Sequence, residues 1–346
     1  MEFTVLQVLW FFLIFLLIAG YFVLDGFDLG VGVLYPLVAK DEAERSIARR
    51  SIGPVWDGNE VWLLTAGGAL FAAFAPAYAT TFSGFYLAIM LVLFGLIVRA
   101  VSLEFRAHDT KWAKVWDACF FIGSLLPALL TGVAVGNIYA GIPMDALGNY
   151  TGIPLLGLVT PFTLLCGLLG LAMMLAAGAS WLAVKAPKPS ELRTRAAGMR
   201  RPLQLVVLVL FLVVSLYGHF GIAPAMDPGL GAVRWILAVL FVVAMVAAFV
   251  FNGNDERDLG VFLAQSFAAI CLVFLLATSM FPNLVVASAG SVGHAVGIAN
   301  AASSETALTA MTIITCIGVP LVLIYHVLVY RMFSGRISQQ ELKHHL

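Results

Sequence analysis

The chain has 346 residues, of which 62% are hydrophobic and 11% charged, and its formal net charge is zero. Soluble domains carry roughly 25% charged residues, so this composition, with a mean hydropathy of +1.00, indicates a polytopic membrane protein. The neutral balance and the lack of a basic tail or stripe exclude a nucleic-acid-binding protein. The four cysteines stand singly in apolar runs, without the spacing of a metal site.

Apolar runs of about 20 residues predict an all-α membrane bundle that forms one integral domain over residues 1–346. Nine transmembrane helices are expected, at 5–38, 53–76, 82–102, 115–138, 157–184, 203–222, 232–251, 259–281 and 307–332. The first is longer than one straight crossing, so it extends past the bilayer or bends at its glycines. The loops between the helices are too short to hold a soluble domain.

The basic residues predict the orientation of the bundle. If the 40–52 loop lies inside the cell, every Lys and Arg except Arg234 falls on or near the inner side. Cytoplasmic loops carry such an excess, so the N-terminus is expected outside and the C-terminus inside. The expected outer loops, 141–154, 221–231 and 282–304, are rich in Gly, Pro, Asn and Ser and contain no Lys or Arg.

A polar stretch opens the second predicted helix, with the sequence Gly-Pro-Val-Trp-Asp-Gly-Asn-Glu-Val-Trp at 53–62. Asp57 and Glu60 are three residues apart and share a helix face, flanked by Trp56 and Trp62. An acidic side chain at the centre of a membrane helix costs about 2.5–3.5 kcal/mol, and its usual meaning is a proton or ion path.

The first helix carries a second pair of acids, Asp25 and Asp28, which also share a face. They are expected in the middle-to-inner part of the membrane. Gly26 and Gly30 form a small-xxx-small pair, which lets another helix approach closely.

Together with Glu104, at the inner end of the third helix, these acids form a possible ladder from the cytoplasm towards the membrane centre. The predicted proton path comprises Asp25, Asp28, Asp57, Glu60 and Glu104. The structural alternative is that the acids pair with Arg99 or cap helix ends.

Histidine positions bear on haem binding, because a bis-histidine site needs two histidines facing one cavity in the membrane. Only His326 lies well within a predicted span, and His219 lies near the outer end of the sixth. The others fall in loops or the tail, at His108, His294, His344 and His345. No haem and no metal site are therefore expected in this chain, and no catalytic residue is assigned, although single or His-Met ligation stays formally open.

Several motifs resemble subunit II of the cytochrome bd-type quinol oxidases. They are Asp25-Gly-Phe-Asp-Leu-Gly-Val-Gly32, Trp56-Asp-Gly-Asn-Glu-Val-Trp62, Thr65-Ala-Gly-Gly-Ala-Leu-Phe-Ala-Ala73, Phe82-Ser-Gly-Phe-Tyr86 and Phe121-Ile-Gly-Ser124. The resemblance is dense over the first 140 residues, and the nine-helix layout agrees over the whole chain.

This resemblance implies a heterodimer in the cell (inner) membrane of bacterial or archaeal type, in which subunit I holds the b- and d-type haems and the quinol-oxidising loop. The complex would oxidise quinol outside and reduce O2 to water with cytoplasmic protons, without a pump. It implies that Asp28, Asp57 and Glu104 border a proton route and that Trp62 lies along an oxygen path. We expect subunit I to pack against the small residues Gly26 and Gly30. Glu60 stands where some members carry Gln. A structural quinone and small accessory subunits remain open.

The competing function is that of a secondary transporter or ion channel, which would also place acids near the midplane. The lack of an internal repeat and the short loops count against it.

Overall fold

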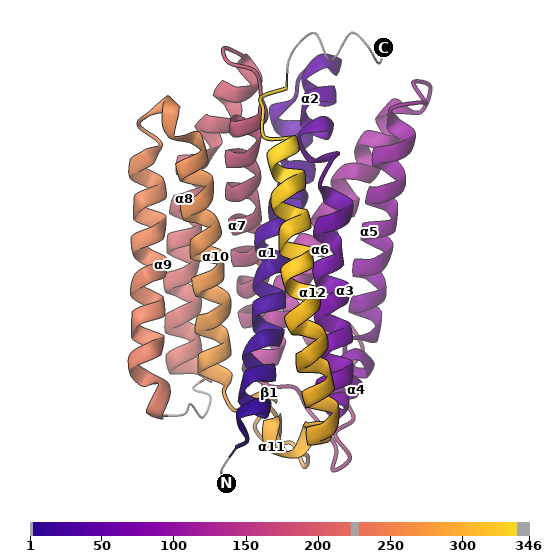
Figure 1. Cartoon of the computed structure of the whole chain (residues 1–346), viewed down its shortest axis with the longest axis vertical. Helices are drawn as coiled ribbons and strands as arrows, with labels where there is room; N and C mark the ends of the chain where they lie inside the picture. The colour runs from indigo at the N-terminus through magenta and orange to yellow at the C-terminus, as the bar shows by residue number, and fades with distance from the viewer. Residues whose placement is uncertain (1–2, 223–227, 338–346) are drawn as a thin grey trace.

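The computed structural model describes residues 3–222 and 228–337. His344, His345 and the middle of the predicted 221–231 loop lie outside the described residues. The long helices alternate in direction along one axis (Figure 1). They are α1 (Val5–Val38), α3 (Trp56–Ala73), α5 (Tyr86–Arg106), α6 (Ala113–Ala140), α7 (Pro161–Lys185), α8 (Glu191–Tyr217), α9 (Gly231–Phe251), α10 (Asp258–Met280) and α12 (Glu305–Met332).

Shorter elements lie at the two ends of the bundle. The helices among them are α2 (Glu42–Ile52), α4 (Ala75–Gly84), α11 (Ile298–Ala301) and the single turns Leu156–Leu158, Gly218–Ile222, Pro228–Leu230 and Asp255–Arg257. Two short antiparallel strands, β1 (Asn283–Val285) and β2 (Val296–Gly297), pair in the predicted 282–304 loop. We call the end that carries α2, the turns at 107–112, 186–190 and 252–257, and the last turn of α12 the basic end (Figure 1).

Eight described helices are long and apolar enough to cross a membrane, namely α1, α5, α6, α7, α8 with the turn that follows it, α9, α10 and α12. This confirms a helical, multi-pass protein. Helix α3 has 18 residues but is not in this set, because its first turns hold Asp57, Asn59 and Glu60. The ninth crossing therefore stays a prediction, as does the orientation of the termini.

Several boundaries differ from the predicted ones; α8 begins at Glu191 where 203 was expected, and two further differences change the layout. The predicted 40–52 loop is helix α2, which begins where the Asp41 carboxylate accepts a hydrogen bond from the Glu44 amide. The predicted helix 53–76 ends at Ala73, because Phe74 leaves the helical conformation and α4 starts in a new direction. Helix α2 was not predicted because its many charged residues make it too polar for a membrane helix.

The core lies where α1 packs against α7, α3, α6 and α10. Gly30 of α1 lies directly on the α7 backbone, so that a Cβ there would overlap the Met174 carbonyl. The predicted close helix approach is thus present, but the helix is α7 of the same chain. The expectation that Gly26 and Gly30 contact a partner subunit is wrong, because both are buried inside this bundle.

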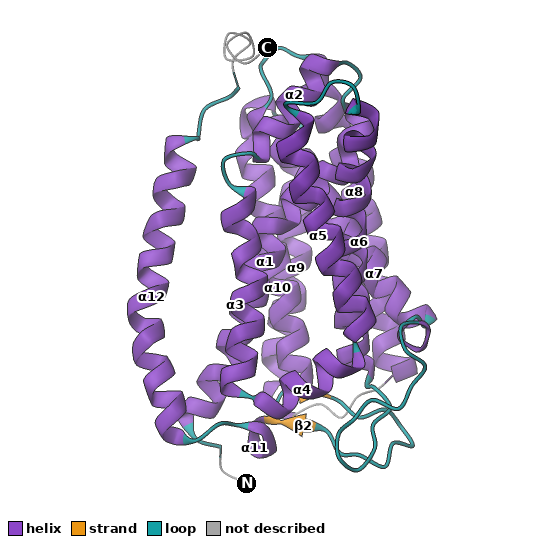
Figure 2. Ribbon diagram, turned by 90° about the vertical axis from the view of Figure 1, so that its right-hand side faces the viewer, coloured by secondary structure: helices purple, strands orange, loops and turns teal. Residues whose placement is uncertain are grey.

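Helix α12 stands apart from the other helices (Figure 2). In its most apolar stretch of 18 residues, only 6% is buried inside the bundle. Most of its side chains are hydrophobic and exposed. It contacts α1 near its start, where the Trp10 indole donates to the Leu308 carbonyl (3.3 Å) and the Thr312 hydroxyl (3.0 Å). Its other side-chain hydrogen bonds to the bundle lie near the basic end.

We predict that Gly30→Ala destabilises the subunit by about 1–3 kcal/mol or more, because a backbone carbonyl must move to admit the methyl group. Gly26→Ala is the matched control on the same helix. Its Cβ would lie 3.4 Å from the flexible Met174 side chain, so its stability should stay near that of the wild type. Thermal denaturation of the purified complex measures both, and equal midpoints would contradict the packing argument.

Candidate functional site

A buried charge cluster lies where α1, α3 and α5 meet. Arg99 of α5 is fully buried, and its Nη1 lies 2.8 Å from Asp25 Oδ1 on α1 and 3.2 Å from Glu60 Oε1 on α3. Breaking a buried ion pair by removing one partner typically costs 3–5 kcal/mol. Arg99 therefore anchors three helices through charge.

The second acid of α1 belongs to the same cluster through an amide. Asn59 of α3 donates from Nδ2 to Asp28 Oδ2 (2.7 Å) and to the Leu24 carbonyl (3.1 Å). Its Oδ1 accepts a hydrogen bond from the Tyr330 hydroxyl of α12 (3.1 Å). One buried side chain thus joins α1, α3 and α12.

The cluster holds three acids, Asp25, Asp28 and Glu60, but Arg99 is the cation that pairs with them among the described residues. If all three were ionised, two negative charges would remain uncompensated in a buried site, which is costly. Asp25 Oδ2 and Asp28 Oδ1 also have no hydrogen-bond partner within the described chain. Binding of a proton relieves the charge excess, so this arrangement suits proton uptake.

Trp62 follows the cluster member Glu60 by two residues on α3. A Cβ at Gly20 would overlap its ring, so Gly20 makes room for the indole against α1. The indole N–H donates to His326 Nε2 on α12 (3.2 Å). Since Nε2 accepts, the other ring nitrogen, Nδ1, carries the proton and donates to the Val322 carbonyl (2.9 Å). His326 is thus held as a neutral hydrogen-bonded residue.

The other two acids of the predicted ladder do not enter the cluster. Asp57 and Glu104 are exposed on the surface of this chain. Asp57 precedes the cluster member Glu60 by three residues, in the first turn of α3, whereas Glu104 lies near the end of α5. The structure therefore brings together Asp25, Asp28 and Glu60 and leaves Asp57 and Glu104 at its surface.

Comparison with known sequences decides the family. The sequence model for "Cytochrome bd terminal oxidase subunit II" matches residues 6–333. The chain belongs to this family. It is an oxidoreductase subunit and an integral multi-pass membrane protein, and a subunit II implies a complex with a subunit I. Membership decides against the transporter or channel considered from the sequence.

The chain also matches individual relatives over nearly their whole length. The chain is 33% identical to the cytochrome bd-I ubiquinol oxidase subunit 2 of Escherichia coli K12, with 99% of this chain and 98% of the relative covered. It is 34% identical to the cytochrome bd ubiquinol oxidase subunit 2 of Bacillus subtilis, with 96% and 97% covered. The bd oxidase structure from Geobacillus thermodenitrificans shares the fold, with a TM-score of 0.79, 17% identity, and 95% of this chain and 99% of that chain covered.

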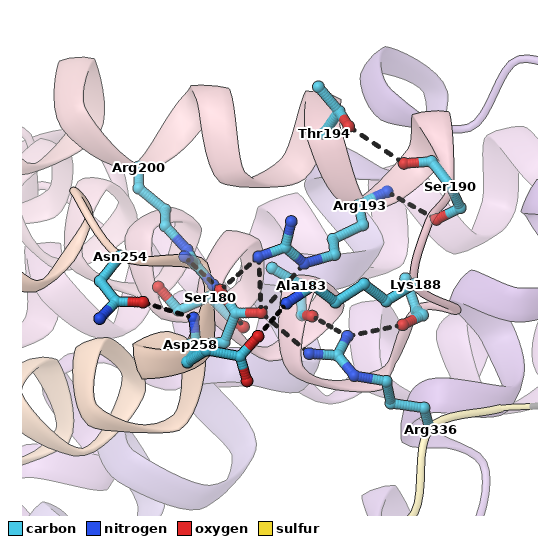
Figure 3. A network of polar contacts seen from close by, with 12 residues as sticks. Ser180, Ala183, Lys188, Ser190, Arg193, Thr194, Arg200, Asn254, Asp258 and Arg336 are labelled. Carbon is cyan, nitrogen blue, oxygen red and sulfur yellow. Dashed lines mark hydrogen bonds and ion pairs between the residues drawn. The ribbon is translucent and has the colours of Figure 1, made fainter.

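Two further ion clusters hold the basic end of this subunit II together. Asp258, the first residue of α10, accepts hydrogen bonds from Arg193 Nε (3.0 Å), Arg200 Nη1 (2.8 Å) and Arg336 Nη2 (3.0 Å) (Figure 3). Arg336 also donates to the carbonyls of Ala183 and Ala186. This network fastens the segment after α12 to α7, α8 and α10.

The second cluster centres on Asp117 of α6. Its carboxylate accepts from the Tyr35 hydroxyl (2.7 Å), Arg45 Nη1 (2.9 Å) and Arg106 Nε (2.9 Å). These contacts attach α2 to α1, α5 and α6. In both clusters arginines outnumber the carboxylate, so the clusters stabilise the basic end and differ from the acid-rich site around Arg99.

Sequence reasoning had raised Arg99 as a possible partner of the acids and had considered His326 for haem binding, but it had missed the contacts of Asn59 and Tyr330. Asn59 had a signal, since a polar amide beside Glu60 in a membrane helix needs partners. Tyr330 had none, because its contact with Asn59 spans 271 positions of sequence.

We predict that Arg99→Met lowers the yield and thermal stability of the complex, because it leaves buried acids without their cation. Adding Asp25→Asn should recover part of the loss, since it removes the acid that pairs most closely with Arg99. Yield by size-exclusion chromatography and the midpoint of thermal denaturation measure both variants. Wild-type values for Arg99→Met would show that the ion pair does not hold this site.

Proposed function

We propose that this chain supplies the scaffold, a proton path and an oxygen path to a quinol:O2 oxidoreductase. Its partner, subunit I, would carry the b- and d-type haems and oxidise quinol, and the complex would reduce O2 to water. The observation that carries the proton role is the buried cluster of three acids around one arginine near the basic end.

The basic end is proposed to face the cytoplasm, because Lys and Arg concentrate there. The N-terminus then lies outside in the cell (inner) membrane of bacterial or archaeal type. Glu60 lies four residues from the start of α3, and Arg99 seven residues before the end of α5. At 1.5 Å per residue, the cluster is about 6–11 Å from the basic end along the helix axes. Protons from the cytoplasm would have a short way to reach it.

The surface acids suggest where subunit I lies. Asp57 and Glu104 are exposed on α3 and α5, on helices that also expose large apolar side chains such as Leu64, Phe94 and Phe105. Lipid is a poor environment for a carboxylate. A face formed by α3, α5 and the unpacked α12 would suit the partner, which would cover the acids and make them the border of the proton path.

The oxygen role is proposed for Trp62 on the same side of the bundle. Its indole lies between Gly20 of α1 and His326 of α12, next to the mostly apolar surface of α12. O2 is apolar and dissolves in hydrocarbon, so a path that starts from the membrane would pass apolar groups of this kind.

A structural quinone would have a place among α6, α7, α8, α9 and α10. A cavity of about 910 Å³ is lined there mainly by apolar side chains, with polar groups from Tyr139, His219 and Arg234. An apolar cavity with few polar groups suits a ligand with a long apolar tail and a polar head. Extraction of the purified complex with organic solvent, followed by chromatography, measures bound quinone, and a quinone-free extract would count against this assignment.

We predict that Asp28→Asn assembles with normal haem content but reduces O2 at least about tenfold more slowly per haem. The amide keeps the size of Asp28 and can still accept from Asn59, but it carries no exchangeable acidic proton. O2 consumption per haem at saturating quinol is the measurement.

The control is Glu191→Gln, which neutralises an exposed acid at the basic end and should leave the rate unchanged. An unchanged rate per haem in Asp28→Asn would remove Asp28 from the obligatory proton route. A parallel loss of haem and activity would assign it a structural role instead.

A further inference from the structure

The amide of Asn59 has one allowed orientation. Its Nδ2 side faces the Asp28 carboxylate and the Leu24 carbonyl, which are both acceptors. Turning the amide over would place Oδ1 against these two oxygens and lose both hydrogen bonds. Oδ1 therefore faces Tyr330, and the phenol must donate its hydrogen to it.

This orientation has a consequence for Asp28. Asn59 occupies its Oδ2, while Oδ1 has no hydrogen-bond partner among the described residues and is buried. The charged groups around Asp28 are Asp25 on α1, Glu60 on α3 and Arg99 on α5, and Tyr330 comes from α12. The amide thus determines which of the two carboxyl oxygens is free to take a proton.

Tyr330 also borders a cavity at the basic end. The cavity has a volume of about 190 Å³, enough for several waters at roughly 30 Å³ each, and its lining includes Tyr330, Trp181, Lys185 and Arg336. Two of the three cations in this wall, Lys185 and Arg336, bind carbonyl groups and Asp258, and the third is Arg50. Tyr330 therefore lies between a polar cavity and the buried Asn59–Asp28 pair.

We propose that Tyr330 and Asn59 are positioning residues for proton exchange at Asp28 Oδ1. Tyr330 fixes the Asn59 amide, and the amide holds Oδ2. A proton donated by water then forms the O–H bond at Oδ1, and the same bond breaks when the proton moves on. Asn59 itself carries no proton. This inference rests on the proposed proton function, and it gives α12, which otherwise packs little against the bundle, a part in proton delivery.

The test is Tyr330→Phe in the assembled complex, with Tyr325→Phe as the matched control. Tyr325 is on the same helix and is 54% exposed, and its hydroxyl has no assigned role in the site. Tyr330→Phe keeps the ring and removes the hydrogen bond to Asn59. We expect normal haem content, a loss of about tenfold in O2 consumption per haem, a shifted pH profile and a larger solvent deuterium isotope effect. Tyr325→Phe should match the wild type in all four.

A double-mutant cycle separates positioning from a general loss of stability. Asn59→Leu should slow the enzyme at least as much as Tyr330→Phe. Because Tyr330 is proposed to act through Asn59, the double variant should be no slower than Asn59→Leu alone. Additive losses in the cycle would overturn the proposal. If Asn59→Leu fails to assemble, the pH profile and isotope effect of Tyr330→Phe decide alone.

The Asp28→Asn variant separates a failure of the proposed proton function from a failure of the positioning role alone. A wild-type rate in Asp28→Asn would overturn the proton function and this inference with it. A slow Asp28→Asn together with a Tyr330→Phe whose rate, pH profile and isotope effect equal those of the wild type would overturn only the positioning role.

Discussion

The buried guanidinium of Arg99 is the interaction on which the rest of the site depends. It lies 2.8 Å from Asp25 and 3.2 Å from Glu60, inside a bundle whose other contacts are largely apolar. A buried charge requires partners, and here one cation faces three acids. The site is therefore held together by its charge and at the same time left with an excess of carboxylates. The first property positions α1, α3 and α5, and the second allows the cluster to bind protons.

The surrounding structure holds the one cation and three acids of this cluster in place. Close packing of α1 on α7 at Gly30 fixes the helix that carries Asp25 and Asp28, and Asn59 satisfies Asp28 with a neutral group. The arginine-rich networks of Asp117 and Asp258 fasten the turns at the basic end without adding acids to the cluster. Helix α12 is held mainly at its ends, so its apolar length is available to a partner. The arginine-rich networks thus only stabilise the basic end, whereas the Arg99 cluster both stabilises the bundle and carries the proposed function.

Much of this was accessible from the sequence. Apolar runs located the long helices, and the cost of carboxylates in hydrocarbon singled out Asp25, Asp28 and Glu60. Local patterns could not show which side chains meet across helices. Asp57 shares a face with Glu60 in the sequence pattern but is exposed in the fold, and Tyr330 reaches Asn59 from the last helix. Gly30 signalled a close helix contact, yet a small-residue spacing does not say whether the neighbour is in the same chain.

The most direct test is redox-induced infrared difference spectroscopy of the assembled complex, because it detects protonated carboxyl groups themselves. The account predicts a carboxyl C=O stretching band that changes when the haems of subunit I are reduced, shifts in D2O and is absent from Asp28→Asn. If the spectrum of Asp28→Asn keeps every carboxyl band of the wild type, Asp28 does not exchange a proton during turnover, and the central claim is contradicted.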